Sequence, residues 1–224
     1  MSFEVIASNF KFLIVQGFLG FGNFAGGTLR LAMPAIALGF LLGIFIGLAR
    51  LAPVWWIRVP ATIYVEFFRG VPLVMVIFWM WFILPQVLGL ALPEYGIALT
   101  AFVIFEAAYF GEIVRAGVQS VARGQVEAAR AIGLTPNQGM AYVILPQALR
   151  NMVPALVTQM IVLFKDTSLA SIIGYVDLTK AAQIVNNREI KPFQLYLFIA
   201  VIYWICTYSM SRVAQRLEHR RVAA

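Results

Sequence analysis

The sequence predicts an all-α integral membrane protein with five transmembrane helices, its N-terminus outside and its C-terminus inside. Hydrophobic residues make up 62% of the 224 residues and charged residues only 12%, which leaves too little polar surface for a water-soluble fold. Five runs reach the length of about 20 residues that a span needs. A backbone inside hydrocarbon must satisfy its own hydrogen bonds, so we expect these runs to be helices. Arginines concentrated in alternate loops predict the orientation.

Three of the five runs carry no charge, and two carry charges that must be buried or solvated. The uncharged runs are residues 31–49, 70–93 and 192–211. The charged runs are residues 95–114, with Glu106 and Glu112, and residues 151–176, with Lys165 and Asp166.

The N-terminal residues 1–28 are predicted to lie at the outer membrane interface. Residues 12–29 are uncharged, but glycines at 17, 20, 22, 26 and 27 weaken a helix there. An interfacial segment therefore fits better than a sixth span. No basic stretch precedes an apolar core with a cleavage pattern, so a removed signal peptide is not expected.

The first span carries a stripe of small residues. Ala35, Gly39, Gly43 and Gly47 recur at every fourth position, which predicts that another helix packs closely against this face. Residues 53–69 follow, with two prolines and an amphipathic run at 63–69. We expect this linker to lie along the cytoplasmic face of the membrane.

The basic residues decide which loops are cytoplasmic. The alternate loops after the first, third and fifth runs contain Arg50, Arg58 and Arg69; Arg115, Arg123, Arg130 and Arg150; and Arg212, Arg216, Arg220 and Arg221. The positive-inside rule then places the C-terminus and the loop that carries Glu127 in the cytoplasm. Because the net charge of +7 follows the membrane topology, a nucleic acid partner is not expected.

The charges inside the spans mark candidate functional residues. Glu106 lies about 12 to 16 Å from the inner end of its run, so it should face the protein interior or water. Lys165 and Asp166 lie roughly 20 Å along theirs. They are either functional or form a structural ion pair with Glu106 or with a neighbouring subunit. Glu112 and Arg115, three residues apart, are expected to pair.

Residues 124–146 are a polar interruption that predicts two short helices and a sharp turn. Residues 127–132 suit a helix, Gly133 suits its left-handed end, and Thr135 with Pro136 suits a new N-terminus. Glu127 and Arg130 have the spacing of an exposed ion pair. On composition alone, a solvated loop between two membrane helices is the alternative.

The order of residues in this interruption resembles the EAA loop of the permease subunits of ABC importers. The matching residues are Glu127, Ala128, Ala129, Gly133, Leu145 and Pro146, with Val143 where isoleucine is usual. In that family the loop docks into the ATPase subunit, so the resemblance implies that these residues couple the chain to an ATPase.

Further segments resemble the permeases of polar amino acid importers, with glutamate/aspartate permeases the most similar. Residues 69–73 resemble the start of that family's second span, with Val71 replacing the common threonine, and residues 163–169 resemble another characteristic run. The resemblance implies the type I ABC importer permease architecture over residues 1–224. It makes substrate-pathway candidates of Glu106, Lys165, Asp166, Thr167 and Ser168.

The same resemblance implies a multi-pass protein of the bacterial inner membrane, surrounded by lipid, and a set of partners. These are an ATP-binding subunit dimer, a second permease that is identical or related, and an extracytoplasmic amino-acid-binding protein. The chain itself would bind no cofactor, since ATP would bind to the partner.

The residues themselves give no sign of an enzyme. The sequence has no GxxxxGK followed by Ser or Thr. It has one cysteine, Cys206, and one histidine, His219, which leaves no Cys/His or Ser/His/Asp constellation and no metal-ligand cluster. A self-contained secondary carrier or channel remains the alternative; an inverted repeat would have favoured it.

Overall fold

The fold consists of helices joined by short connections. The computed structural model describes residues 4–21, 26–89 and 92–222, without the side chains at 213 and 216–222, and these residues form no strand. The elements in order are α1 (Glu4–Phe10), the π-helical η1 (Lys11–Leu19), α2 (Thr28–Leu51), α3 (Trp55–Gly70), α4 (Leu73–Leu88), α5 (Glu94–Gln119), α6 (Arg123–Ala131), α7 (Pro136–Gly139), the π-helical η2 (Met140–Ile144), α8 (Leu145–Asp166), the 3₁₀ turn η3 (Thr167–Ile173), α9 (Leu178–Glu189) and α10 (Pro192–Val222).

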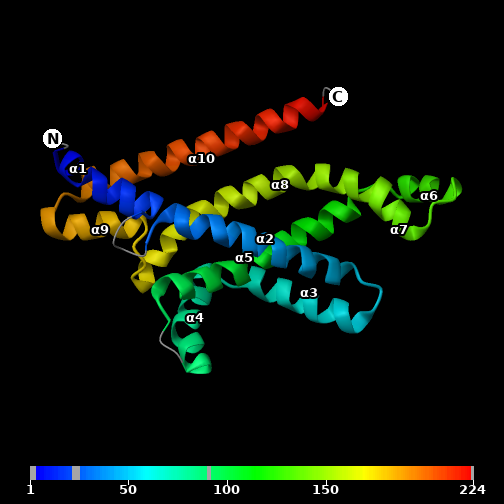
Figure 1. Cartoon of the computed structure of the whole chain (residues 1–224), viewed down its shortest axis with the longest axis horizontal. Helices are drawn as coiled ribbons and strands as arrows, with labels where there is room; N and C mark the ends of the chain where they lie inside the picture. Colours follow the sequence, from blue (N-terminus) through cyan, green and yellow to red (C-terminus); the bar gives the residue numbers. More distant parts are fainter. Residues whose placement is uncertain (1–3, 22–25, 90–91, 223–224) are drawn as a thin grey trace.

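Four long helices follow the long axis of the molecule, and the short helices gather at its two ends. Helices α2, α5, α8 and α10 run along this axis (Figure 1). Helices α6 and α7 lie at one end, whereas α1 and α9 lie at the other. Side chains from α2, α4, α5 and α8 form the main apolar core, in which Phe102, Phe110 and Leu163 are fully buried.

The prediction of five spans is confirmed when one bent helix pair is counted as a span. Four helical stretches in the described residues are long and apolar enough to cross a membrane: Thr28–Leu51, Glu94–Gln119, Pro136–Ile173 and Pro192–Arg212. The fifth candidate joins α3 to α4, which meet at an angle of 108°.

The second span therefore differs from the sequence-based expectation. Of the predicted run at residues 70–93, Gly70 ends α3, the 16 residues of α4 form the one helix that lies within the described part of the run before the break at Gly89, and residues 90–91 lie outside the described residues. Helix α3 contacts α2 and α5 and buries Val65, while most of its other residues are exposed. Its expected location on the cytoplasmic face of the membrane stays a prediction. The bend has a local cause, because Pro72 restricts Val71 to an extended conformation, with φ −113° and ψ 149°.

The N-terminal segment is not one continuous helix. Helix η1 ends at Leu19, Gly20 takes the left-handed φ of 86°, and α2 begins at Thr28. Val5 and Leu13 of this segment pack into a second apolar cluster with side chains of α9 and α10. Residues 12–29 thus form no sixth span where they are described, and residues 1–3 and 22–25 lie outside the described part. The interfacial location of residues 1–28 stays a prediction.

The predicted close packing of the first span is confirmed. The small-residue face of α2 lies against α5. A Cβ atom added to Gly43 would stand 2.6 Å from the Cβ of Phe110 and 3.0 Å from the backbone nitrogen of Gly111. One added to Gly47 would stand 2.7 Å from the carbonyl oxygen of Gly111. The two backbones approach this closely because glycine has no side chain.

A buried carboxylate fixes the start of α9. Asp177 is fully buried and accepts hydrogen bonds from the backbone N–H groups of Lys180 (2.9 Å) and Thr179 (3.0 Å). The hydroxyl of Tyr203, on α10, donates to it at 3.3 Å. Thr28 accepts from the backbone N–H of Leu178 at 3.2 Å, so the starts of α2 and α9 are held together.

Replacing Asp177 by asparagine should make the stability of the protein less dependent on pH, because asparagine does not ionise. Burial raises the pKa of Asp177 to about 6, although hydrogen bonds to the carboxylate oppose this. In an unfolded chain an aspartate titrates near 3.9. The folded state therefore holds this proton more tightly, so the contribution of Asp177 to stability is complete below about pH 4 and is lost as pH rises through 6, a loss of about 3 kcal/mol. Asparagine caps a helix as well as aspartate. The unfolding temperature of Asp177→Asn should therefore change less between pH 4.5 and 7.5 than that of the wild type.

The exposed Glu189 at the other end of α9 offers a matched control. Glu189→Gln should unfold with the pH dependence of the wild type. Equal pH dependence in Asp177→Asn and wild type would contradict the assigned cause.

Candidate functional site

Glu112 is the centre of an ion cluster that joins three helices. Arg115 donates to it through Nε at 2.9 Å and Nη2 at 2.6 Å, so the predicted pair is confirmed. Arg50, near the end of α2, also donates to Glu112. Arg69, near the end of α3, lies 3.9 Å from the same carboxylate. The cluster ties the ends of α2 and α3 to α5.

Glu106 faces the protein interior, as its depth in the span requires. It is fully buried, and the Nε2 of Gln159 donates to its Oε2 at 2.9 Å. Its Oε1 has no hydrogen-bond partner in the part of the chain that the structure describes. The ion pair between Glu106 and Lys165 that the sequence left open is not formed, since Gln159 occupies the carboxylate and Lys165 is exposed.

A cleft of about 490 Å³ opens between the α3–α4 bend, α5 and α8. Asp166, which is half-buried, and Gln159 line it from α8, and Tyr109 lines it from α5. The other lining residues are Val71, Pro72, Leu73, Phe105, Val162 and Leu169. The volume is that of a small-molecule site, and a few polar groups in an apolar wall are typical of one.

The other predicted pathway residues lie elsewhere. Lys165 and Ser168 line a separate hollow of about 370 Å³ against α9 and α10. Neighbouring residues of a helix project about 100° apart, so Lys165 and Asp166 face different sides of α8. Thr167 is fully buried and donates to the carbonyl oxygen of Phe164 at 2.7 Å. Of the five candidates, only Asp166 lines this cleft, and Glu106 lies buried behind Gln159, which donates to it.

A second hollow continues the cleft toward α6. It measures about 280 Å³ and is lined by Glu112, Ile113, Ala116, Gly117, Ser120, Asn151, Met152 and Ala155. The residues that line the two hollows recur every three or four positions on both α5 and α8, so both hollows lie along one face of this helix pair. Asn151 donates to the hydroxyl of Ser120 at 2.8 Å, and this hydrogen bond lies at the α6 end of the face.

Two residues of this face were not predicted from the sequence as site residues. Gln159 and Tyr109 are uncharged, and a search for charges inside the spans passes over them. A signal was present, because Gln159 lies seven residues before Asp166 and shares its face of the helix.

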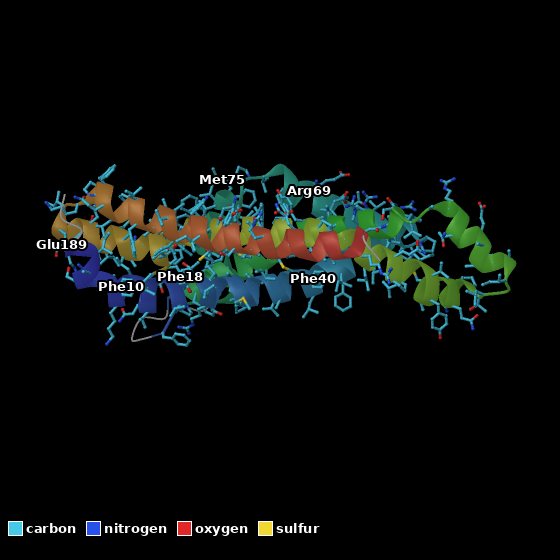
Figure 2. All side chains as sticks on the ribbon, turned by 90° about the horizontal axis from the view of Figure 1, so that it is seen from above. Phe10, Phe18, Phe40, Arg69, Met75 and Glu189 are labelled. Carbon is cyan, nitrogen blue, oxygen red and sulfur yellow. The ribbon has the colours of Figure 1, made fainter. Side chains whose placement is uncertain are left out.

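Viewed at right angles to Figure 1, Arg69 and Met75 lie along one edge of the bundle, opposite Phe10, Phe18 and Phe40 (Figure 2).

The loop between α5 and α8 has the local structure that the sequence predicts. Helix α6 ends at Ala131, and Gly133, two residues later, takes the left-handed φ of 85°. Thr135 caps α7, and Gln138 completes the reciprocal capping box through bonds of 2.9 and 3.4 Å. The predicted pair of Glu127 and Arg130 is not formed: both are exposed, and the salt bridges of the described residues do not include it. Exposed pairs of this kind gain little free energy.

The loop presents apolar side chains at its surface. Ile132 is 77% exposed and Tyr142 is 73% exposed, and Met140, Leu145 and Leu149 are exposed as well. Ala128 and Pro146 are exposed, whereas Ala129 is buried. A hollow of about 240 Å³ lies between α6 and α7. Exposed apolar groups this concentrated are typical of a protein interaction surface.

Comparison with known proteins identifies the family. The family described as "Binding-protein-dependent transport system inner membrane component" matches residues 35–222. The chain is 42% identical over 204 residues to the glutamate/aspartate import permease protein GltK of Escherichia coli O6:H1. This match covers 86% of this chain and 89% of that protein. It is 41% identical over 197 residues to the probable glutamine ABC transporter permease protein GlnP of Bacillus subtilis, with 87% and 90% covered.

Solved structures agree with this assignment. A crystal structure of an amino acid ABC transporter with histidines matches with a TM-score of 0.89 and 33% identity, covering 98% of this chain and 99% of that one. An inward-facing MetNI methionine ABC transporter matches with a TM-score of 0.72 at 19% identity, a likeness of fold alone. The chain therefore belongs to the binding-protein-dependent transport system inner membrane component family, as a permease of the amino acid ABC importers.

Proposed function

We propose that the chain forms part of the translocation pathway of an ATP-driven importer of polar amino acids, of the glutamate/aspartate class. The observation that carries this proposal is the face shared by α5 and α8. Two hollows follow each other along it, and Asp166, Gln159 and Glu112 line them. Polar groups on the outer face of membrane helices need a covering that is not lipid. A second permease, identical or related, supplies this covering and encloses the pathway.

The substrate class rests on similarity to relatives. The relative named for glutamate and aspartate import is 42% identical to this chain, and one named for glutamine is 41% identical. The three amino acids share a zwitterionic backbone and a polar side chain, so the cleft suits each of them. An extracytoplasmic binding protein would deliver the substrate in the bacterial inner membrane.

The loop between α5 and α8 is the proposed contact with an ATP-binding subunit dimer. The coupling residues are Glu127, Ala128, Ala129, Gly133, Leu145 and Pro146. Closure of the dimer around ATP would move the loop and, through it, the two helices that line the hollows. Because ATP binds to the partner, the chain needs no cofactor of its own. The partner's two states must contact the loop differently for this movement to occur.

Uptake measured against a panel of labelled amino acids tests the function. The chain, produced with its ATP-binding, permease and binding-protein partners, should take up glutamate and aspartate in an ATP-dependent manner. Uptake of glutamine alone would show that the substrate is glutamine and not glutamate or aspartate. Uptake that persists without an ATP-binding subunit would show that the chain is a self-contained carrier.

Lys165→Met should reduce uptake several-fold and leave assembly intact. Lys165 is exposed within its span and makes no salt bridge to another described residue. A charge that is costly to insert and is not used in packing is expected to serve transport. The amount of partner that co-purifies reports assembly, and Lys180→Met on the nearby α9 is the control. Loss of the complex in Lys165→Met would instead assign Lys165 a structural role, for example in an ion pair with the second permease.

A further inference from the structure

The outward face of α10 carries two exposed aromatic side chains followed by an arginine. Tyr203 and Met210 pack against the main core, whereas Trp204 and Tyr208 project away from it and are 63% and 50% exposed. Their rings stack, with centroids 5.4 Å apart and an interplanar angle of 20°. The Cζ of Arg212 lies 5.7 Å from the centroid of the Tyr208 ring, over the ring. Three side chains spaced four residues apart therefore form one continuous exposed row, here named the α10 row.

Arg212 stands at the end of an apolar helix and is not neutralised by the protein around it. It is exposed and forms no salt bridge with another residue that the structure describes. The apolar stretch that ends at Arg212 begins at Pro192 and is 21 residues long, which is about the thickness of the hydrocarbon core. Arg212 is therefore expected at the level of the lipid headgroups. Tryptophan and tyrosine favour the same level.

The surroundings of the α10 row are positively charged and lie away from the coupling loop. Arg216, Arg220 and Arg221 follow in the sequence, with Glu218 as the one acidic residue after Arg212. Along the long axis of the molecule, α10 ends before α6 and α7 are reached (Figure 1), so the row lies apart from the proposed contact with the ATP-binding subunit. Basic residues next to the end of a membrane helix attract anionic lipids. The guanidinium group suits a phosphate, to which it donates two parallel hydrogen bonds.

We propose that the α10 row is a binding site for an anionic phospholipid, in which Arg212 binds the headgroup phosphate and the rings of Trp204 and Tyr208 lie along the acyl chains. The Tyr208 ring attracts the guanidinium that lies over it and so favours its position before lipid binds. Charge favours lipid over a protein covering. An apolar helix of a second permease would bury Arg212 without an anion, which is costly, whereas an anionic lipid supplies one. The inference goes beyond the proposed function, because this ligand is not transported.

The fluorescence of Trp204 reports which lipid covers the row. The permease complex with its ATP-binding subunit is placed in bilayers that contain phosphatidylglycerol or phosphatidylcholine with brominated acyl chains, which quench tryptophan on contact. Subtracting the signal of Trp204→Phe isolates Trp204. Brominated phosphatidylglycerol should reach half-quenching at about one fifth of the fraction that phosphatidylcholine needs, the preference that one arginine gives near a membrane surface.

Variants of Arg212 and the salt concentration test the cause of this preference. Arg212→Gln should quench alike with both lipids, and Arg212→Lys should keep most of the preference. Raised salt should weaken the preference in the wild type, because it screens exposed charges. Arg123→Gln, which changes an exposed arginine at the start of α6, is the matched control and should quench as the wild type does.

Equal quenching of wild-type Trp204 by the two lipids would overturn the proposal, as would a preference that survives in Arg212→Gln. Trp204 that neither lipid quenches would also overturn it, by showing that protein, such as the second permease, covers this face. If Arg212→Gln fails to assemble, Arg212→Lys decides, and a preference that raised salt leaves unchanged there would overturn the proposal. The measurement uses neither substrate nor ATP, so its failure leaves the proposed function to be tested by uptake.

Discussion

Replacing Glu127 by lysine should reduce ATP-driven uptake at least tenfold while the subunit stays in the membrane. Glu127 is exposed on α6 and does not pair with Arg130, so its carboxylate faces outward from the loop. The fold does not depend on it, because the turn is held by Gly133 and by the Thr135 cap. Reversing a charge in a docked surface adds repulsion as well as removing attraction. A tenfold loss corresponds to about 1.4 kcal/mol.

The measurement combines membrane level, uptake and the amount of ATP-binding subunit that co-purifies. Glu189→Lys is a matched charge reversal on an exposed residue of α9, at the opposite end of the molecule (Figure 1), and should leave co-purification unchanged. Uptake at the wild-type rate in Glu127→Lys would exclude the loop as the coupling element.

Replacing Gly43 by alanine should strongly destabilise the chain. The new methyl group would stand 2.6 Å from the Cβ of Phe110 and 3.0 Å from the backbone nitrogen of Gly111. Neither atom is at the flexible end of a side chain, so α2 and α5 must move apart. Overpacking of this kind costs about 1–3 kcal/mol, more than the gain of up to about 1 kcal/mol from alanine's higher helix propensity. The unfolding temperature of the purified subunit should fall by several degrees.

Gly96→Ala is the matched control, because it makes the same change in the first turn of α5. Among the described residues a Cβ atom there would meet only the ring of Pro93, at 3.9 Å, so the propensity gain should remain and the unfolding temperature should not fall. If Gly43→Ala is as stable as Gly96→Ala, the close approach of α2 and α5 is not what holds the pair together.

The sequence predicted most spans because the hydrocarbon core imposes a length and a composition on any helix that crosses it. The second span is built differently from the expectation, because α4 has only 16 residues and meets α3 at an angle of 108°. Residues 63–69 have the amphipathic pattern of a surface helix. In the structure the hydroxyl of Tyr64 donates to the backbone carbonyl of Ile104 on α5, whereas Ile63 and Phe67 are exposed. Periodicity shows that one face of a helix is apolar. It does not show whether lipid or another helix covers that face.

Site residues were predictable where a local rule applies. The turn at Gly133 and the cap at Thr135 follow from backbone conformation and from one side-chain hydrogen bond, and both were confirmed. The pairing of Glu112 with Arg115 follows from helical spacing. In contrast, the partner of Glu106 is Gln159, 53 positions away, and no local rule connects residues on different helices.

By itself the sequence determined that the chain crosses a membrane with helices, where the loop between α5 and α8 turns, and which family the chain resembles. These follow from composition, helix-end chemistry and an ordered motif, all of which are local in the chain. Tertiary structure alone decided that Asp166 shares a cleft with Tyr109 while Lys165 faces α10, and that Arg69 stands over Tyr109. The physical reason is that neighbouring residues on a helix diverge by about 100°. Which of them meet depends on how the helices pack.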